Sequence, residues 1–151
     1  MSDDDTPSYL LGAEECEAFL TAFADGSLPA EEWTHQAHIA MATVYLNRYG
    51  DSVLTHTRAA IRNYLLARGR PIGAYHETLT IFWLALVAEA ISRQTDASLH
   101  ETVKRNCAAF GGQSKLHEQY YGFDVFNSPE AHARWMPPDL RPLTIPFPTD
   151  I

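Results

Sequence analysis

Three histidines stand close to the starts of two apolar segments of the 151-residue sequence. His35 and His38 lie three positions apart before one apolar stretch, and His76 precedes another. Burying an imidazole without a partner costs free energy, so histidines in these places need an explanation. Neutral imidazole is the commonest metal ligand in proteins, and residues three apart on a helix are neighbours. We therefore hypothesise a metal held between two helices.

A set of three protein ligands suits catalytic zinc, because a fourth position then stays open for water or substrate. The sequence predicts His35, His38 and His76 as these ligands. Non-haem iron more often takes a carboxylate, and Glu77 and Glu32 are adjacent candidates. Either glutamate can instead act as general base on a metal-bound water. The expected cofactor is a divalent metal, zinc or iron, and hydrolysis of a small molecule is the first reaction considered. Whether the protein is an enzyme stays open.

The spacing His-x-x-His also arises by chance in helical proteins, so two other interpretations remain. The histidines can be core residues whose second nitrogens bond to backbone carbonyls or to Glu32 and Glu77. They can also line an apolar pocket that contains no metal, which would make the protein a non-catalytic module that binds or senses a small molecule. The residues expected to contact such a molecule are Trp33, Tyr75, Thr80 and Trp83.

Apolar residues at helical spacing predict the elements that position these side chains. We expect helices over 13–24, 35–49, 52–68, 77–93 and 99–110, with shorter helical pieces over 114–121 and 129–135. Thr34 is the expected N-cap of the second helix, because its hydroxyl can accept from an unpaired amide. For the same reason Ser98 and Ser128 are expected to cap the fifth helix and the last short piece, and Asp51 or Ser52 the third helix. The fourth helix is apolar around most of its circumference, which is typical of a helix surrounded by others. The starts of the second and fourth helices must meet if the histidines share a site.

The length of the chain favours a single all-α domain, a bundle of five to six helices over residues 9–151. A chain of this size buries roughly 68–70% of its unfolded surface, so it needs no metal merely to fold. Residues 1–8 are expected to form a disordered acidic tail. The proline-rich ending, 136–148, is expected to be extended and to strap across the bundle. It could also pack on a second copy, so a homodimer is considered.

Composition excludes some classes of function. Eleven Lys and Arg against nineteen Asp and Glu give a net charge of −8, so the chain lacks the basic surface that nucleic acid requires. No apolar run is long enough to span a bilayer and no signal peptide is apparent, so we expect a cytoplasmic protein without membrane contact. Cys16 and Cys107 are expected to be buried hydrophobes. His56, His100 and His117 are expected at the surface.

Several stretches resemble a family of small uncharacterised bacterial helical proteins. The resemblance is carried by Trp33-Thr34-His35-x-x-His38, by Tyr75-His76-Glu77-Thr78-x-Thr80, by Tyr120-Tyr121 and by the ending that runs from Ser128 to Leu143. It covers about residues 10 to 143. The resemblance implies a helical fold and a shared functional site at His35, His38 and His76, and it implies no particular reaction.

Overall fold

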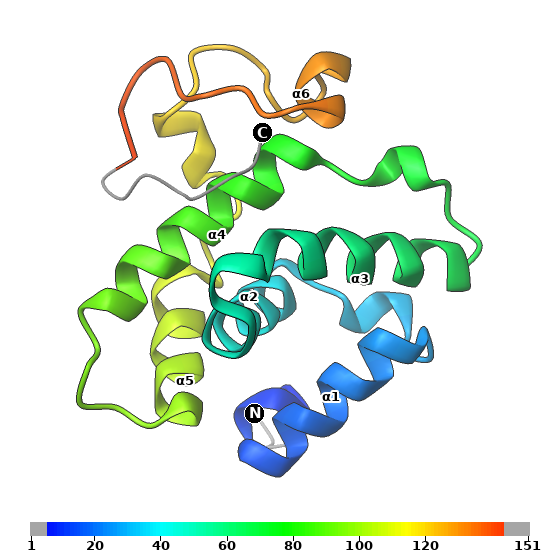
Figure 1. Cartoon of the computed structure of the whole chain (residues 1–151), viewed down its shortest axis with the longest axis vertical. Coiled ribbons are helices and arrows are strands. Elements are labelled where there is room, and N and C mark those ends of the chain that lie inside the picture. Colours follow the sequence, from blue (N-terminus) through cyan, green and yellow to red (C-terminus); the bar gives the residue numbers. More distant parts are fainter. Residues whose placement is uncertain (1–5, 144–151) are drawn as a thin grey trace.

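The computed structural model describes residues 6–143, and all regular structure within them is helical (Figure 1). The long helices are α1 (Ala13–Asp25), α2 (His35–Tyr49), α3 (Val53–Ala67), α4 (Glu77–Ser92) and α5 (Leu99–Phe110). The short elements are η2 (Ser8–Leu10), η3 (Ala30–Glu32), η4 (Gly50–Ser52), η5 (Ile72–Ala74), η6 (Leu116–Gln119) and α6 (Pro129–Ala133). The predicted all-α fold is confirmed.

Side chains at predicted N-caps fix where three of the six described α-helices begin. Thr34, Ser98 and Ser128 each accept a hydrogen bond from the backbone N–H three residues further on. A cap of this kind stabilises a helix by about 1 kcal/mol. Ser52 precedes α3 without capping it, because its hydroxyl donates instead to the Tyr49 carbonyl of the preceding helix. The chain therefore turns from α2 into α3 through η4 without a side-chain cap.

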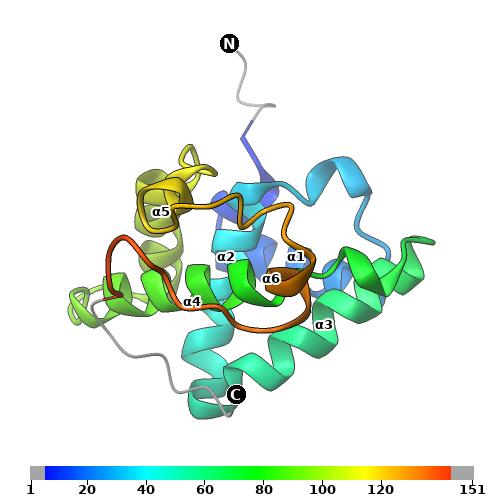
Figure 2. The same ribbon diagram turned by 90° about the horizontal axis from the view of Figure 1, so that it is seen from above.

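Helix α2 lies at the centre of the bundle, in contact with α3, α4 and α5 (Figures 1 and 2). Every residue from 39 to 45 is buried, so this part of α2 is enclosed on all sides. Its first turn is less enclosed, and His35 and His38 are only partly buried there. The functional candidates on α2 thus stand at the end of a helix whose body is fixed by packing.

Helix α4 separates two hydrophobic clusters, which explains why it is apolar around most of its circumference. Ile81 and Leu84 belong to the larger cluster, formed with residues of α1, α2, α3 and α5. Phe82 and Leu86 belong to the smaller one, formed with residues between 120 and 131. In Figure 1, α4 accordingly passes between α5 and the segment that leads to α6. The predicted enclosure of this helix is confirmed.

The segment after α6 is irregular as far as residue 143 and crosses the first turn of α4. The Thr78 hydroxyl donates to the Arg134 carbonyl at 2.7 Å, and the Tyr121 hydroxyl donates to the Met136 carbonyl at 2.7 Å. The rest of the expected proline-rich strap, 144–151, lies outside the described residues. So do residues 1–5 of the expected acidic tail, whereas residue 8 already belongs to η2.

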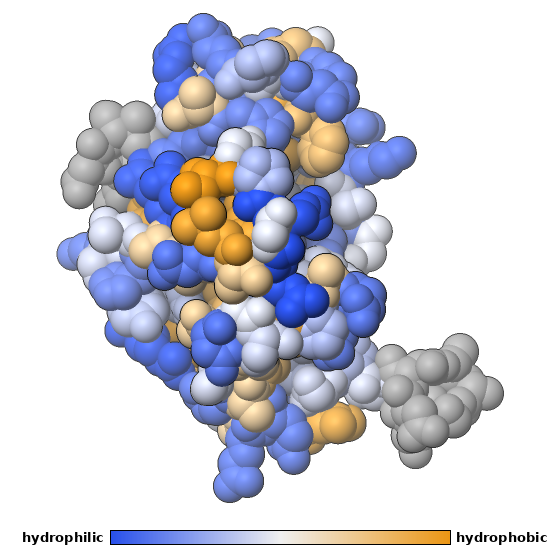
Figure 3. Space-filling model, turned by 90° about the vertical axis from the view of Figure 1, so that its right-hand side faces the viewer, coloured by the Kyte–Doolittle hydropathy of each residue, from blue (hydrophilic) through white to orange (hydrophobic). Residues whose placement is uncertain are grey.

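Within residues 6–143, no helix combines the length and hydropathy needed to cross a bilayer. On the face that Figure 3 shows, hydrophobic residues gather in one region among hydrophilic ones. Leu66 in α3 and Ile72 in η5 are among the large hydrophobic side chains left exposed, at 57% and 46%.

Candidate functional site

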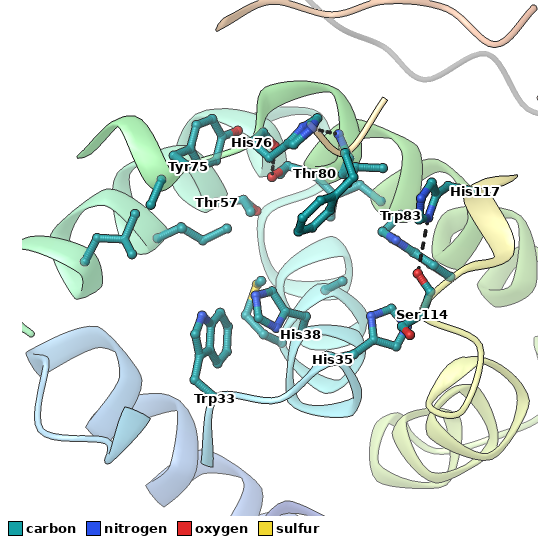
Figure 4. A pocket seen from close by; sticks show the side chains of 18 residues that line it. Trp33, His35, His38, Thr57, Tyr75, His76, Thr80, Trp83, Ser114 and His117 are labelled. Atoms are coloured by element: carbon teal, nitrogen blue, oxygen red, sulfur yellow. Dashed lines mark hydrogen bonds between the residues drawn. The ribbon is translucent and has the colours of Figure 1, made fainter. Parts of the chain in front are cut away.

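A cavity of about 370 Å³ lies where the starts of α2 and α4 face each other (Figure 4). Pockets that bind small molecules usually measure roughly 300–1,000 Å³. Aromatic, aliphatic, imidazole and hydroxyl side chains line it, and no Asp, Glu, Lys or Arg of the described residues does. Of the nine residues predicted for the site, the seven that line the cavity are Trp33, His35, His38, Tyr75, His76, Thr80 and Trp83.

Three groups of side chains surround the cavity in Figure 4. His35 and His38 lie on α2, and Tyr75, His76 and Thr80 lie opposite, at the start of α4. Trp83, Ser114 and His117 close another side. The predicted meeting of the starts of the second and fourth helices is therefore confirmed.

His76 uses both ring nitrogens inside the protein. Its Nδ1 accepts from the Leu79 backbone N–H at 3.1 Å and caps α4, and its Nε2 lies 2.9 Å from the Val125 carbonyl. A carbonyl only accepts, so the ring carries its hydrogen on Nε2 and is neutral. Burial lowers the pKa of His76, against the opposing effect of the bond to Val125. His76 therefore ties the start of α4 to the 123–127 segment and has no free nitrogen.

Among residues 6–143, His35 and His38 each have one ring nitrogen without a hydrogen-bond partner. His35 donates from Nε2 to the Phe110 carbonyl at 3.1 Å, and His38 donates from Nδ1 to the Thr34 carbonyl at 2.7 Å. Burial lowers the pKa of both rings, that of His38 to about 4, so both are neutral at pH 7. The second nitrogen of each ring is then a hydrogen-bond acceptor without a hydrogen. The alternative prediction, that these histidines bond to backbone carbonyls, matches the geometry of all three rings.

The two predicted catalytic glutamates do not line the cavity. Glu77 is paired with Arg58, whose Nε lies 2.9 Å from Oε1, and it accepts from the Tyr75 hydroxyl at 2.7 Å. Burial raises the pKa of Glu77, but the bonds from Arg58 and Tyr75 outweigh it and lower that pKa overall. Glu32 is exposed in η3. The geometry thus makes Glu77 a partner of Arg58 and leaves Glu32 at the surface, so it supports neither as a general base.

The predicted metal ligands do not form a metal-binding group. Among residues 6–143, no three His, Cys, Asp or Glu side chains are arranged to hold a metal ion. His76 could coordinate one only by giving up the cap of α4 or its bond to Val125. The three-histidine metal site stays a prediction, and this donor geometry does not favour it.

Among the cavity residues that the sequence did not predict, Thr57 and His117 bear on the chemistry of the site. Thr57 on α3 is 0% exposed, and its hydroxyl oxygen has no hydrogen-bond partner among the described residues. His117 was expected at the surface, but it is only 8% exposed and donates from Nδ1 to the Ser114 carbonyl at 3.2 Å. The short element η6 directs the His117 side chain inward. The surrounding sequence, which lies between glycines, has no apolar periodicity from which this burial could be predicted. His56 is exposed as predicted, whereas His100 is partly buried.

Aromatic contacts fix the two tryptophans of the cavity wall. Trp33 lies between Phe23 and His38, with ring centroids 4.3 and 3.8 Å away, and Trp83 meets His35 edge-on at 4.6 Å. Aromatic pairs in such arrangements contribute about 0.5–1.5 kcal/mol beyond the area they bury. These contacts hold the two tryptophans in place along the cavity wall.

The two cysteines do not take part in this site. Cys16 and Cys107 are free and buried, and burial raises the pKa of their thiols to about 11 and about 12. A thiol is a nucleophile only after losing its proton. Both cysteines act as buried hydrophobes, as predicted.

Comparisons with protein-family models, with curated proteins and with solved structures found no match.

Proposed function

We propose that the protein is a binding module whose cavity takes a small, uncharged organic ring that carries a hydrogen-bond donor. The volume of the cavity, about 370 Å³, is near the lower end of the usual range for ligand pockets. Trp33, Trp83 and Phe126 supply apolar ring surfaces along its wall. These features support a compact and largely apolar ligand.

The histidines support a ligand that is neutral and donates a hydrogen bond. With their pKa values lowered by burial, His35 and His38 carry no positive charge at pH 7 that would attract an anion. Each has already used its N–H on a backbone carbonyl. Each ring can therefore only accept from a ligand.

The Thr57 hydroxyl is the observation that carries the proposal. A buried polar group without a partner costs about 1–3 kcal/mol, so proteins rarely keep one without a reason. Thr57 lines the cavity, its side chain is fully buried, and its oxygen is unpaired among the described residues. Because Thr57 is 0% exposed, a ligand bonds to this hydroxyl once a neighbouring side chain moves aside, and the new bond then recovers that cost.

Calorimetric titration with indole and benzofuran tests the proposal. The two molecules have the same shape, but only indole has an N–H donor. Indole is expected to bind one to one, and benzofuran roughly two- to twelvefold more weakly, which is the loss of one hydrogen bond. Thr57→Val should weaken the binding of a donor or acceptor ligand, whereas Thr55→Val, on the exposed face of the same helix, should not. Absence of saturable binding by both molecules would refute the proposal.

The metal-dependent hydrolase expected from the sequence is tested separately, by elemental analysis. Wild-type protein and His38→Ala are dialysed against a weak chelator before zinc and iron are measured. Near-equimolar metal that disappears in the variant would favour the hydrolase over the binding module. The binding module predicts no stoichiometric metal in either protein.

A further inference from the structure

A second, larger hollow adjoins the cavity. It measures about 780 Å³ and is lined by residues between 114 and 127 together with Leu140, and we call it the outer hollow. Ser114, His117 and Phe126 line both spaces. The two spaces are therefore neighbours that share these three side chains, and a ligand longer than one ring that passes these side chains would reach the outer hollow.

The outer hollow differs from the cavity in its charge. Lys115, Glu118 and Asp124 line it, whereas no charged residue of the described chain lines the cavity. Within residues 6–143, none of these three takes part in an ion pair. Asp124 accepts from the side chain and backbone of Asn127, which lowers its pKa, so it is ionised at pH 7. Two carboxylates against one ammonium leave the hollow with an excess of negative charge.

Aromatic side chains add to this preference for a cation. Tyr121, Phe123 and Phe126 line the outer hollow, and Tyr121 and Phe123 meet edge-on with centroids 5.7 Å apart. The face of an aromatic ring attracts a cation through its electrostatic quadrupole. Carboxylates beside aromatic rings suit an ammonium group better than an anion.

We propose that the cavity and the outer hollow form one site for an amphipathic amine, with its uncharged ring in the cavity and its ammonium group beside Glu118 and Asp124. This inference rests on the proposed function of the cavity. The part of the ligand inside the cavity stays an uncharged ring, and a cationic group is added outside the cavity.

The test uses three probes that share the indole ring and differ at the end of a two-carbon chain: tryptamine, tryptophol and indole-3-propionate. Tryptamine is expected to bind most tightly and indole-3-propionate least tightly in calorimetric titrations. Glu118→Gln should reduce the ratio of the tryptamine affinity to the indole-3-propionate affinity by roughly two- to fivefold, the scale of one exposed charge pair. Lys115→Gln should raise the same ratio. Glu14→Gln, an exposed residue of α1, makes the same change in net charge away from the site and should leave the ratio unchanged.

The two proposals fail in different ways. If indole binds and Thr57→Val weakens it, but the three longer probes bind equally, the cavity stands and the extended site is overturned. The extended site is also overturned if indole-3-propionate binds most tightly, or if Glu118→Gln and Glu14→Gln have the same effect. If indole itself does not bind, the proposed function fails, and the extended site fails with it.

Discussion

The cap that His76 provides for α4 can be separated from any role as a metal ligand by two substitutions. His76→Ala removes both the acceptor for the Leu79 N–H and the donor to the Val125 carbonyl. His76→Asn keeps an acceptor at the N-cap, because asparagine is among the best N-cap residues. Neither variant retains an imidazole, so both would equally abolish a metal site.

The magnitudes follow from the two bonds. Loss of an N-cap costs about 1 kcal/mol, and loss of a buried hydrogen bond costs about another 1 kcal/mol. His76→Ala should therefore lower the free energy of unfolding by about 2 kcal/mol, and His76→Asn by about 1 kcal/mol. For a domain of this size, these losses correspond to falls in Tm of about 4–8 °C and about 2–4 °C.

Urea unfolding followed by circular dichroism measures both variants against the wild type. Repeating the titrations with a chelator shows whether a metal contributes to stability. Equal destabilisation by the two variants would refute the capping role of Nδ1. Loss of wild-type stability in chelator would show that a metal contributes as well.

Two further predictions concern the protonation of His38 and the ion pair between Glu77 and Arg58. Because burial lowers the pKa of His38 from 6.5 to about 4, the stability it contributes is present above pH 6.5 and is lost as the pH falls toward 4. The loss of stability is at most about 3 kcal/mol. Between pH 7 and pH 4.5, the urea midpoint of His38→Gln should therefore fall less than that of wild type or of the exposed control His56→Gln. Equal falls in the three proteins would contradict the lowered pKa of His38. Glu77→Gln leaves Arg58 without its partner and should cost about 2 kcal/mol of stability while indole affinity stays unchanged. A large loss of affinity in a variant that still folds would instead place Glu77 in the ligand site.

Much of the fold follows from local sequence. The apolar periodicity of α1 to α5 and the caps Thr34, Ser98 and Ser128 depend on residues within a few positions of each other, so the helices could be predicted. Seven site residues could be predicted because they cluster at two helix starts, and a shared site requires these starts to meet. The sequence therefore predicts the position of the cavity in the fold.

The chemistry of the site depended on partners that are distant in sequence. The Val125 carbonyl lies 49 positions after His76, and the Phe110 carbonyl lies 75 positions after His35. Arg58, the partner of Glu77, is on a different helix. Without these contacts, a histidine that caps a helix and a histidine that coordinates a metal have the same sequence signature. Residue type and spacing alone therefore could not separate the two.

Thermal unfolding of wild type and Thr57→Val, each with and without indole, tests the central claim most directly. A ligand that binds only the folded state raises its Tm. Without indole, Thr57→Val is expected to unfold at a higher temperature than wild type, because the unpaired buried hydroxyl is gone. With indole, wild type should gain more in Tm than the variant. Two results would contradict a binding role for this cavity. One is a wild type whose Tm indole does not raise. The other is a variant that is less stable than wild type without ligand and gains as much in Tm from indole as wild type does.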